Sequence, residues 1–141
     1  MRAVLDTSVL VAAIRGRAGA SKALLAAALQ SQFHFLISTP LVLEYEAVLT
    51  RREHLLVAGL SIGEVQEMLD MVCAAGIQVQ MTQSWRPKLR DPDDEMVSRT
   101  AINGQADTIV TFNRADFVGF VEEFGVQVLS PMAALRRMDV K

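Results

Sequence analysis

The sequence predicts an α/β protein built on a mainly parallel β-sheet. Short apolar segments with strand patterns alternate along the chain with longer segments that have helix patterns, which is typical of sheets whose strands are joined by helical connections. The chain has 141 residues, the size of one ordinary domain, and 51% of them are apolar. We therefore expect residues 1–141 to form a single domain with a sizeable core.

In the first third of the chain, an apolar run that stops at Asp6 indicates the first strand, and a segment rich in Ala and Leu indicates a helix before the second strand. The expected elements are a strand over 2–5, helices over 9–14 and 21–30, and a strand over 33–38. Thr39 and Pro40 then predict a helix start with Thr39 as the N-cap, because Pro is favoured at the first helical position.

Further along, Ser61 and Glu64 have the spacing of a capping box, with Leu60 and Val65 as a possible hydrophobic staple. The helix that they start is expected to end near residue 75, with Gly76 as its stop. The remaining expected elements are a strand over 77–81, a loop over 82–90, a helix from 91 to about 103, strands over 108–112 and 126–129, and a closing helix over 131–138.

The composition limits which cellular compartment and which binding partners can be expected for this protein. Cys73 is the single cysteine, so no internal disulfide can form, and its apolar surroundings predict a buried thiol. The longest early apolar run, residues 9–14, is far too short to span a bilayer. We expect a cytoplasmic protein with no membrane contact. The formal net charge of −2 lacks the basic balance common in nucleic-acid binders, so such a function must be argued from a site.

Acidic residues from distant segments are predicted to meet at one edge of the sheet. Asp6 ends the first strand, Glu44 lies one turn into the helix after the second strand, Asp94 lies in the first turn of its helix, and Asp116 follows the strand over 108–112. In open α/β sheets, sites form beyond the carboxyl ends of the strands. We therefore take these four acids as the candidate catalytic and metal-binding residues.

Each acid also has a purely structural interpretation. Asp6 could cap the following helix. The acidic run from 91 to 95 could be there because negative charges near a helix N-terminus interact favourably with the helix macrodipole. Glu44 could be a solvated residue paired with Arg51 or Arg52, and Asp116 could cap a turn. Together these interpretations are weaker than they are separately, because gathered carboxylates raise one another's pKa and need a compensating cation.

Carboxylates without cysteines or paired histidines favour a hard ion such as Mg²⁺ or Mn²⁺. The two histidines, His34 and His54, fall in separate segments and give no zinc ligand set. Such an ion can activate a water molecule and neutralise charge on a phosphodiester. The chain has no Gly-rich phosphate loop.

Basic residues near these acids are candidates for holding the phosphates that flank the reacting phosphodiester. Arg86, Lys88 and Arg90 directly precede the acidic run, and Arg99 and Arg114 lie close to the candidate acids in the sequence. Arginine and lysine hold phosphates as forks or point charges. A solvated surface loop is the alternative for the segment over 86–90.

Four segments, in order, resemble PIN domains. Residues 3–13 (AVLDTSVLVAA) resemble the family's opening, in which an invariant Asp closes the first strand. Residues 39–45 (TPLVLEY), 91–97 (DPDDEMV) and 106–117 (ADTIVTFNRADF) resemble the segments that carry its second, third and fourth acidic positions. The ordered set, with the closing Leu-Ser-Pro at 129–131, covers nearly the whole chain and looks closest to VapC-like toxin components of bacterial toxin–antitoxin systems.

The resemblance implies a three-layer α/β/α sandwich around a parallel sheet. It implies cleavage of RNA that depends on Mg²⁺ or Mn²⁺, restraint by a cognate antitoxin protein, and a homodimer. Asp6, Glu44 and Asp94 match the first three acidic positions. A catalytically silent RNA-binding or scaffold module with the same fold is the alternative.

Two positions depart from the family pattern. Ser8 stands where the family often has Asn, and Asn113 stands where the fourth acid is common, with Asp116 as a possible substitute. Ser8 also argues against a phosphotransferase of the haloacid-dehalogenase type, which needs a second Asp there. A receiver domain would need an acidic pair at the first strand and a late Lys beside the phosphate, and Asp6 stands alone.

Overall fold

The computed structural model describes residues 1–16, 19–82 and 92–139, and the side chains in these ranges except those of 92–95, 120–122 and 139. The strands are β1 (Arg2–Leu5), β2 (His34–Ile37), β3 (Ile77–Gln78), β4 (Thr108–Val110) and β5 (Gln127–Leu129). The helices are α1 (Thr7–Arg15), α2 (Gly19–Leu29), α3 (Thr39–Leu49), α4 (Arg52–Ala58), α5 (Ile62–Ala75), α6 (Pro92–Asn103), the 3-10 helix η1 (Arg114–Phe117), α7 (Val118–Phe124) and α8 (Pro131–Asp139).

The described strands form one sheet in the order β3-β2-β1-β4-β5. All neighbouring strands run parallel, and Ala3 of the central strand lies opposite Phe35 of β2 and Thr108 of β4. The predicted α/β class is confirmed, and the sheet is parallel throughout rather than mainly so. The strand ends therefore meet at two edges, which we call the carboxyl edge and the amino edge.

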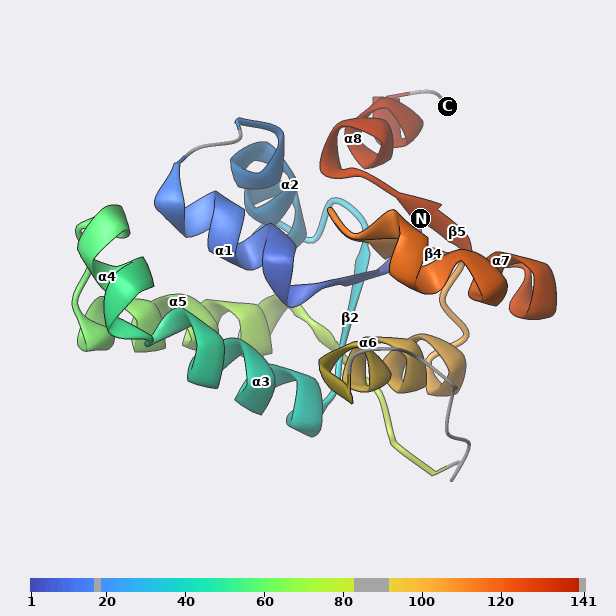
Figure 1. Ribbon diagram of the computed structural model, residues 1–141, viewed down its shortest axis with the longest axis horizontal. Helices are drawn as coiled ribbons and strands as arrows, with labels where there is room; N and C mark the ends of the chain where they lie inside the picture. Colours follow the sequence, from blue (N-terminus) through green and yellow to red (C-terminus); the bar gives the residue numbers. More distant parts are fainter. Residues whose placement is uncertain (17–18, 83–91, 140–141) are drawn as a thin grey trace.

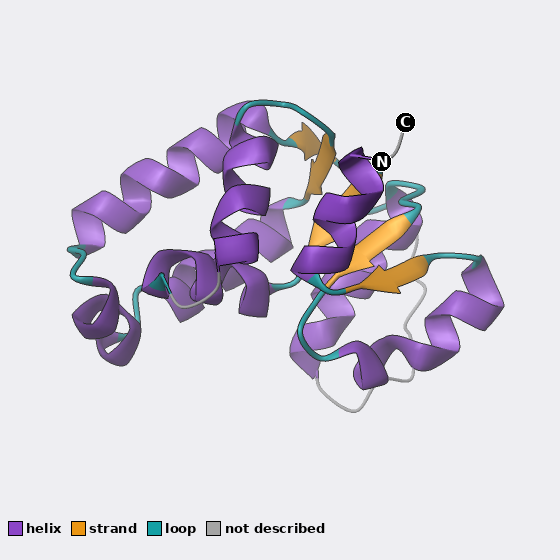
Figure 2. Cartoon of the chain, turned by 90° about the horizontal axis from the view of Figure 1, so that it is seen from above, coloured by secondary structure: helices purple, strands orange, loops and turns teal. Residues whose placement is uncertain are grey.

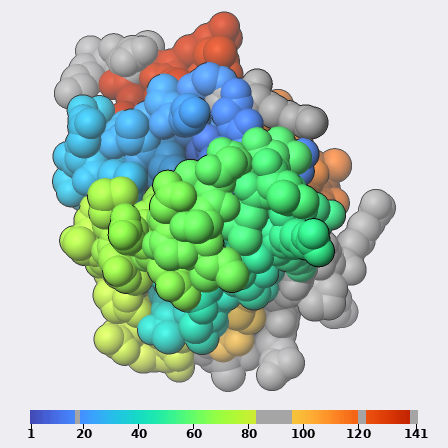
Figure 3. Space-filling view, turned by 90° about the vertical axis from the view of Figure 1, so that its left-hand side faces the viewer, coloured from blue at the N-terminus to red at the C-terminus, as the bar shows by residue number. Residues whose placement is uncertain are grey.

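Helices cover the sheet on both sides, which confirms the predicted sandwich. In Figure 1, α1, α2 and α8 lie above the sheet and α6 lies below it, and Figure 2 shows the strands enclosed by helices from a second direction. Contacts of α6 with β1, β2 and β4 place it across the sheet centre. Helices α3, α4 and α5 extend to one side, and Figure 3 shows α4 and α5 at the surface there, below α1 and α2.

The core lies where the parallel strands are buried on both faces, which explains why they appear as unbroken apolar runs. Val4, Leu5, Leu36 and Ile109 have no solvent-exposed surface. β1 has the predicted bounds, and the other four described strands are shorter than predicted. Val79, for example, lies beyond the last residue of β3, although it is buried and its N–H donates to the Ile37 carbonyl of β2 at 2.7 Å.

Helix α3 begins one residue earlier than predicted. Its N-cap is Ser38, whose hydroxyl accepts a hydrogen bond from the Leu41 N–H at 3.3 Å. The prediction of Thr39 as the cap is wrong, and Pro40 is the second helical residue. Ser38 is favoured because a cap hydroxyl bonds the N–H three residues on, and β2 already ends at Ile37.

Helix α5 begins as predicted, with both hydrogen bonds of the Ser61–Glu64 capping box present. It ends before Gly76, which has an ordinary φ of −73°; a Cβ there would lie 2.7 Å from Ile37 Cδ1, so close packing selects glycine. The prediction of a buried Cys73 is wrong, because this cysteine is exposed. The buried face of α5 runs through Val65, Leu69 and Val72, and residue 73 lies beside it.

Three short elements were not expected from the sequence: α4, η1 and α7. Helix α4 has no buried residue, so it has no apolar face to reveal it, and it ends at Gly59 with a left-handed φ of 69°. The other two elements lie between β4 and β5. The loop predicted over 82–90 lies, apart from Thr82, outside the described residues.

Candidate active site

Asp6 lies at the carboxyl edge, directly after the central strand. Its N–H donates to the Val110 carbonyl of β4 at 2.9 Å, and its carbonyl accepts from the Val9 N–H of α1 at 2.9 Å. The residue is only 6% exposed. The backbone of Asp6 is therefore held between the sheet and the first helix, which fixes where its carboxylate can point.

Two hydroxyl groups hold the Asp6 carboxylate. Ser8 Oγ and Thr111 Oγ1 each donate to Asp6 Oδ2 at 2.7 Å. The side chain makes no capping bond to the first turn of α1, all of which is described, so the capping interpretation does not hold. Within the described residues no hydrogen bond uses Asp6 Oδ1. The described residues thus anchor one carboxylate oxygen and leave the other without a hydrogen bond from any of them.

The two hydroxyl groups are themselves held by the loop after β4. Asn113 N–H donates to Thr111 Oγ1 at 2.9 Å, and Phe112 N–H donates to Ser8 Oγ at 3.4 Å. Each hydroxyl thus accepts from the backbone and gives its proton to the carboxylate. Ser8, which stands where the family often has Asn, bonds the carboxylate two residues before it, and Thr111 adds a bond that sequence reasoning missed, since residue 111 was assigned only to a strand.

Tyr45 is a second residue to which the sequence analysis gave no role of its own. It is completely buried, and its hydroxyl donates to the Leu5 carbonyl, the last of β1. Burial, and to a smaller degree the negative charge of Asp6, raises the pKa of Tyr45 well above its usual value. The phenol therefore stays a neutral donor and ties α3 to the strand that carries Asp6.

The helices that carry Glu44 and Asp94 meet at the carboxyl edge. Thr100 of α6 donates to the Met96 carbonyl, so Ser38 at the start of α3 supplies the proton of the buried 2.7 Å hydrogen bond between Ser38 and Thr100. Glu44 is partly buried on α3, next to Tyr45. Asp94 lies in the first turn of α6, and its side chain lies outside the described residues.

The candidates for the fourth position lie in the turn after Thr111. Asn113 precedes η1 and is exposed, and its side chain makes no capping bond. Asp116 is partly buried, and its N–H donates to the Asn113 carbonyl at 3.0 Å. The turn brings both residues to the carboxyl edge, next to a residue that bonds Asp6.

Among the side chains that the structure describes, no three His, Cys, Asp or Glu residues come close enough to hold a metal ion. Asp94 falls outside that comparison. The donor chemistry at Asp6 nevertheless fits a hard divalent cation, because one of its carboxylate oxygens is used by no described donor and such ions prefer oxygen ligands.

Of the predicted RNA-backbone residues, Arg114 is exposed in η1 and Arg99 is partly exposed on α6. The Arg99 Nε atom has no hydrogen-bond partner in the described part of the chain. Arg86, Lys88 and Arg90 lie outside the described residues. No helix in the described ranges is both long and apolar enough to cross a membrane.

A parallel α/β sheet with a held aspartate beyond its central strand defines a class of protein whose chemistry lies at the carboxyl edge. Residues 2–115 of this chain match the PIN domain family. The chain belongs to that family, whose members are typically nucleases that use divalent metal ions. Comparison with curated proteins found no match.

Proposed function

We propose that this protein is an endoribonuclease that depends on Mg²⁺ or Mn²⁺. The observation that carries the proposal is the arrangement at Asp6: a buried carboxylate, with one oxygen held by two hydroxyls and the other unused by any described donor. A carboxylate so placed is costly unless a cation joins it. The PIN family gives the reaction class, because its members are typically nucleases.

Asp6, Glu44 and Asp94 are the residues proposed to hold the ion, with Asp116, or Asn113 in its place, as the fourth. When bound, the ion supplies a water of lowered pKa and positive charge beside the phosphodiester. Ser8 and Thr111 orient the Asp6 carboxylate, and Tyr45 holds the end of β1 from within the core. These three residues therefore position the site and do not touch the substrate.

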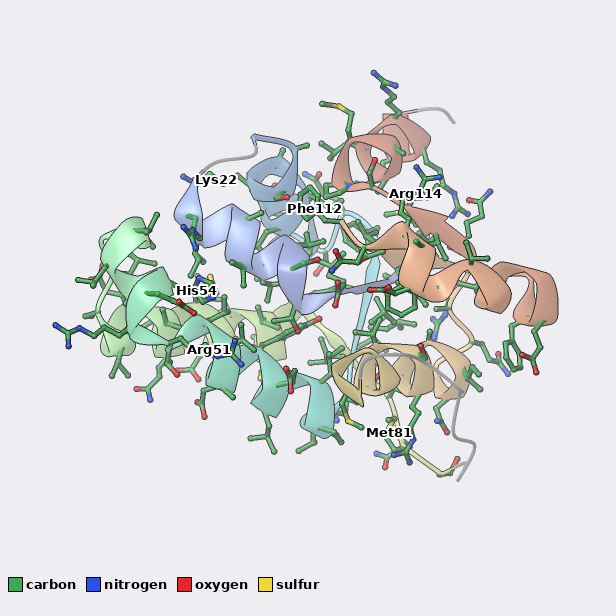
Figure 4. The ribbon with its side chains drawn as sticks, viewed as in Figure 1. Lys22, Arg51, His54, Met81, Phe112 and Arg114 are labelled. Atoms are coloured by element: carbon green, nitrogen blue, oxygen red, sulfur yellow. The ribbon has the colours of Figure 1, made fainter. Side chains whose placement is uncertain are left out.

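RNA is the proposed substrate, and arginines are its proposed backbone contacts. Arg114 projects from η1 at the edge where Asn113 and Asp116 lie, and Figure 4 labels it. Arg99 lies on α6, the helix that also carries Asp94. A net charge of −2 gives no overall attraction to a polyanion, so binding depends on these local residues.

We further propose that the protein is the toxin of a toxin–antitoxin pair and acts as a homodimer. The order of the four acidic segments supports this assignment, since it resembles VapC-like toxin components. Expression of the chain should arrest growth, and Asp6→Asn should restore it. Co-expression with the neighbouring open reading frame should also restore growth if that frame encodes the antitoxin.

The direct test is incubation of labelled RNA with the protein and Mn²⁺, Mg²⁺ or EDTA. We expect internal cleavage with either metal, none with EDTA, and none from Asp6→Asn in any condition. A wild-type protein that binds RNA without cleaving it in Mn²⁺ would favour the alternative, a silent RNA-binding or scaffold module.

A further inference from the structure

Phe112 is the most exposed of the described aromatic side chains and lies beside the candidate site. It is 49% exposed, whereas Tyr45 and Phe117 are fully buried. Its N–H donates to Ser8 Oγ, and that same hydroxyl donates to the Asp6 carboxylate. The ring therefore belongs to a residue that is two hydrogen bonds from the proposed metal ligand.

The loop that presents Phe112 is held in place on both sides. Thr111 N–H donates to the Leu129 carbonyl of β5 at 2.9 Å, and Asn113 N–H donates to Thr111 Oγ1 at 2.9 Å. A side chain on an already ordered loop loses little further conformational freedom when it binds a ligand. The exposure of Phe112 is thus a fixed feature of the carboxyl edge.

The side chains on this loop are complementary to a nucleotide. Arg114, two residues on, is an exposed cation, and Figure 4 labels both side chains. An exposed aromatic ring and an exposed cation two residues apart on one loop can bind the base and the phosphate of a nucleotide, the combination by which proteins bind single-stranded RNA. A base paired within a duplex does not offer its face to such a ring.

We propose that Phe112 stacks on an unpaired base close to the scissile phosphate and is a base-binding residue of the site. This inference rests on the proposed ribonuclease function and adds to it the residue that selects an unpaired nucleotide. The stacking is expected to tolerate any base, because every base has a π-face. Sequence preference would then come from other contacts.

The test is a double-mutant cycle that combines removal of the Phe112 ring with removal of one base of the RNA. The cleavage site of a single-stranded RNA is mapped first, and copies are then made in which one base near that site is removed while its sugar and phosphate remain. Removing the stacked base should lower kcat/KM of the wild type by about 5- to 100-fold, the usual effect of losing one aromatic–base stack. Phe112→Ala should cause the same loss on intact RNA and no further loss on that copy.

Matched variants separate stacking from bulk and from damage to the fold. Phe112→Tyr should retain the activity, and Phe112→Leu, which keeps an apolar side chain without a ring, should lose most of it. Phe124→Ala is the control, because Phe124 is 39% exposed at the end of α7, before the start of β5 at the amino edge. It should leave kcat/KM unchanged.

Annealing a complementary strand should abolish the difference between wild type and Phe112→Ala, since the paired base is no longer open to stacking. If, at every position of the removed base, the combined loss of kcat/KM equals the product of the two separate losses, Phe112 and the base act independently. The inference is then overturned while the ribonuclease function stands. The same holds if Phe112→Ala acts only by changing the oligomeric state. A wild type that cleaves no RNA in Mn²⁺ overturns the proposed function, and this inference with it.

Discussion

Asp6 follows the central strand β1 at the carboxyl edge, Asp107 precedes β4 at the amino edge, and the partners of these two aspartates differ in kind. Asp6 at the carboxyl edge accepts hydrogen bonds from two neutral hydroxyls. Asp107 at the amino edge accepts from the Arg2 N–H at 3.1 Å, the Thr108 hydroxyl at 2.7 Å and the Arg137 guanidinium at 3.1 Å. The described protein thus supplies a cation to one carboxylate and to the other only hydroxyls.

The Asp107 arrangement is structural. Arg137 lies on α8, so its contact with Asp107 joins the last helix to the amino ends of β1 and β4. Partial burial alone would raise the pKa of Asp107, but the bonds from Thr108 and Arg2 and the charge of Arg137 bring that pKa below its usual value. This carboxylate has a cation within the protein, whereas we propose that the more deeply buried Asp6 binds one from outside.

The largest expected effect comes from neutralising one aspartate at a time. Asp6→Asn should lower RNA cleavage by at least about a hundredfold, the scale of losing one electrostatic group at a reaction centre. It should leave the fold intact, because its shape is unchanged. Asp94→Asn should do the same, and Glu44→Gln should be less severe. Cleavage rates and circular dichroism spectra measure the two properties.

Asp107→Asn is the matched control for that comparison, because it removes the same charge from the opposite edge. It should leave cleavage near the wild-type rate. Unfolding of the Asp6→Asn variant, or full activity in it, would show that both aspartates are structural and would end the contrast between the edges.

The next effect is on stability in the presence of metal. An ion that binds only the folded protein raises the free energy of unfolding by about 2.7 kcal/mol at a hundredfold excess over Kd. Thermal melts with Mn²⁺ should therefore show a higher Tm for wild type and Asp107→Asn, and an unchanged Tm for Asp6→Asn. A wild-type Tm that does not change in millimolar Mn²⁺ would contradict a metal site at the carboxyl edge.

A smaller effect concerns pH at the amino edge. Because the pKa of folded Asp107 is lowered, its contribution to stability is present above the unfolded pKa of about 3.9 and is lost as pH falls through the folded value. The pair with Arg137 is open to solvent, so the contribution should stay below about 1 kcal/mol. Urea unfolding from pH 6 to pH 3 should show a steeper loss for wild type than for Asp107→Asn. If the free energy of unfolding falls with pH equally in the two proteins, Asp107 does not contribute to the pH dependence of stability.

The sequence was sufficient to predict the alternation of strands and helices and the place of Asp6, because an apolar run that ends in Asp marks the end of a buried strand. It did not reveal Tyr45 or Thr111 as polar partners at that strand end, because their residue types suit a core helix or a strand equally well. Their hydrogen bonds join segments far apart in the chain, Thr111 to Asp6 and Tyr45 to Leu5, and depend on the sheet order.

The smallest expected effect concerns the fourth position, where the structure places Asn113 and Asp116 in one turn. If Asp116 serves the metal, Asp116→Asn should lower activity several-fold and raise the Mn²⁺ concentration needed for half-maximal rate. Asn113→Asp should then lower that concentration, because it adds an oxygen ligand of the kind that hard ions prefer. If Asn113 instead acts as a neutral ligand or hydrogen bonds to the attacking water, Asn113→Asp should be harmful and Asp116→Asn nearly silent. The partial burial of Asp116 and the exposure of Asn113 favour the first outcome, because a partly buried residue lies closer to the body of the protein than an exposed one. One Mn²⁺ titration of the two variants distinguishes these outcomes, and a catalytically silent protein would respond to neither.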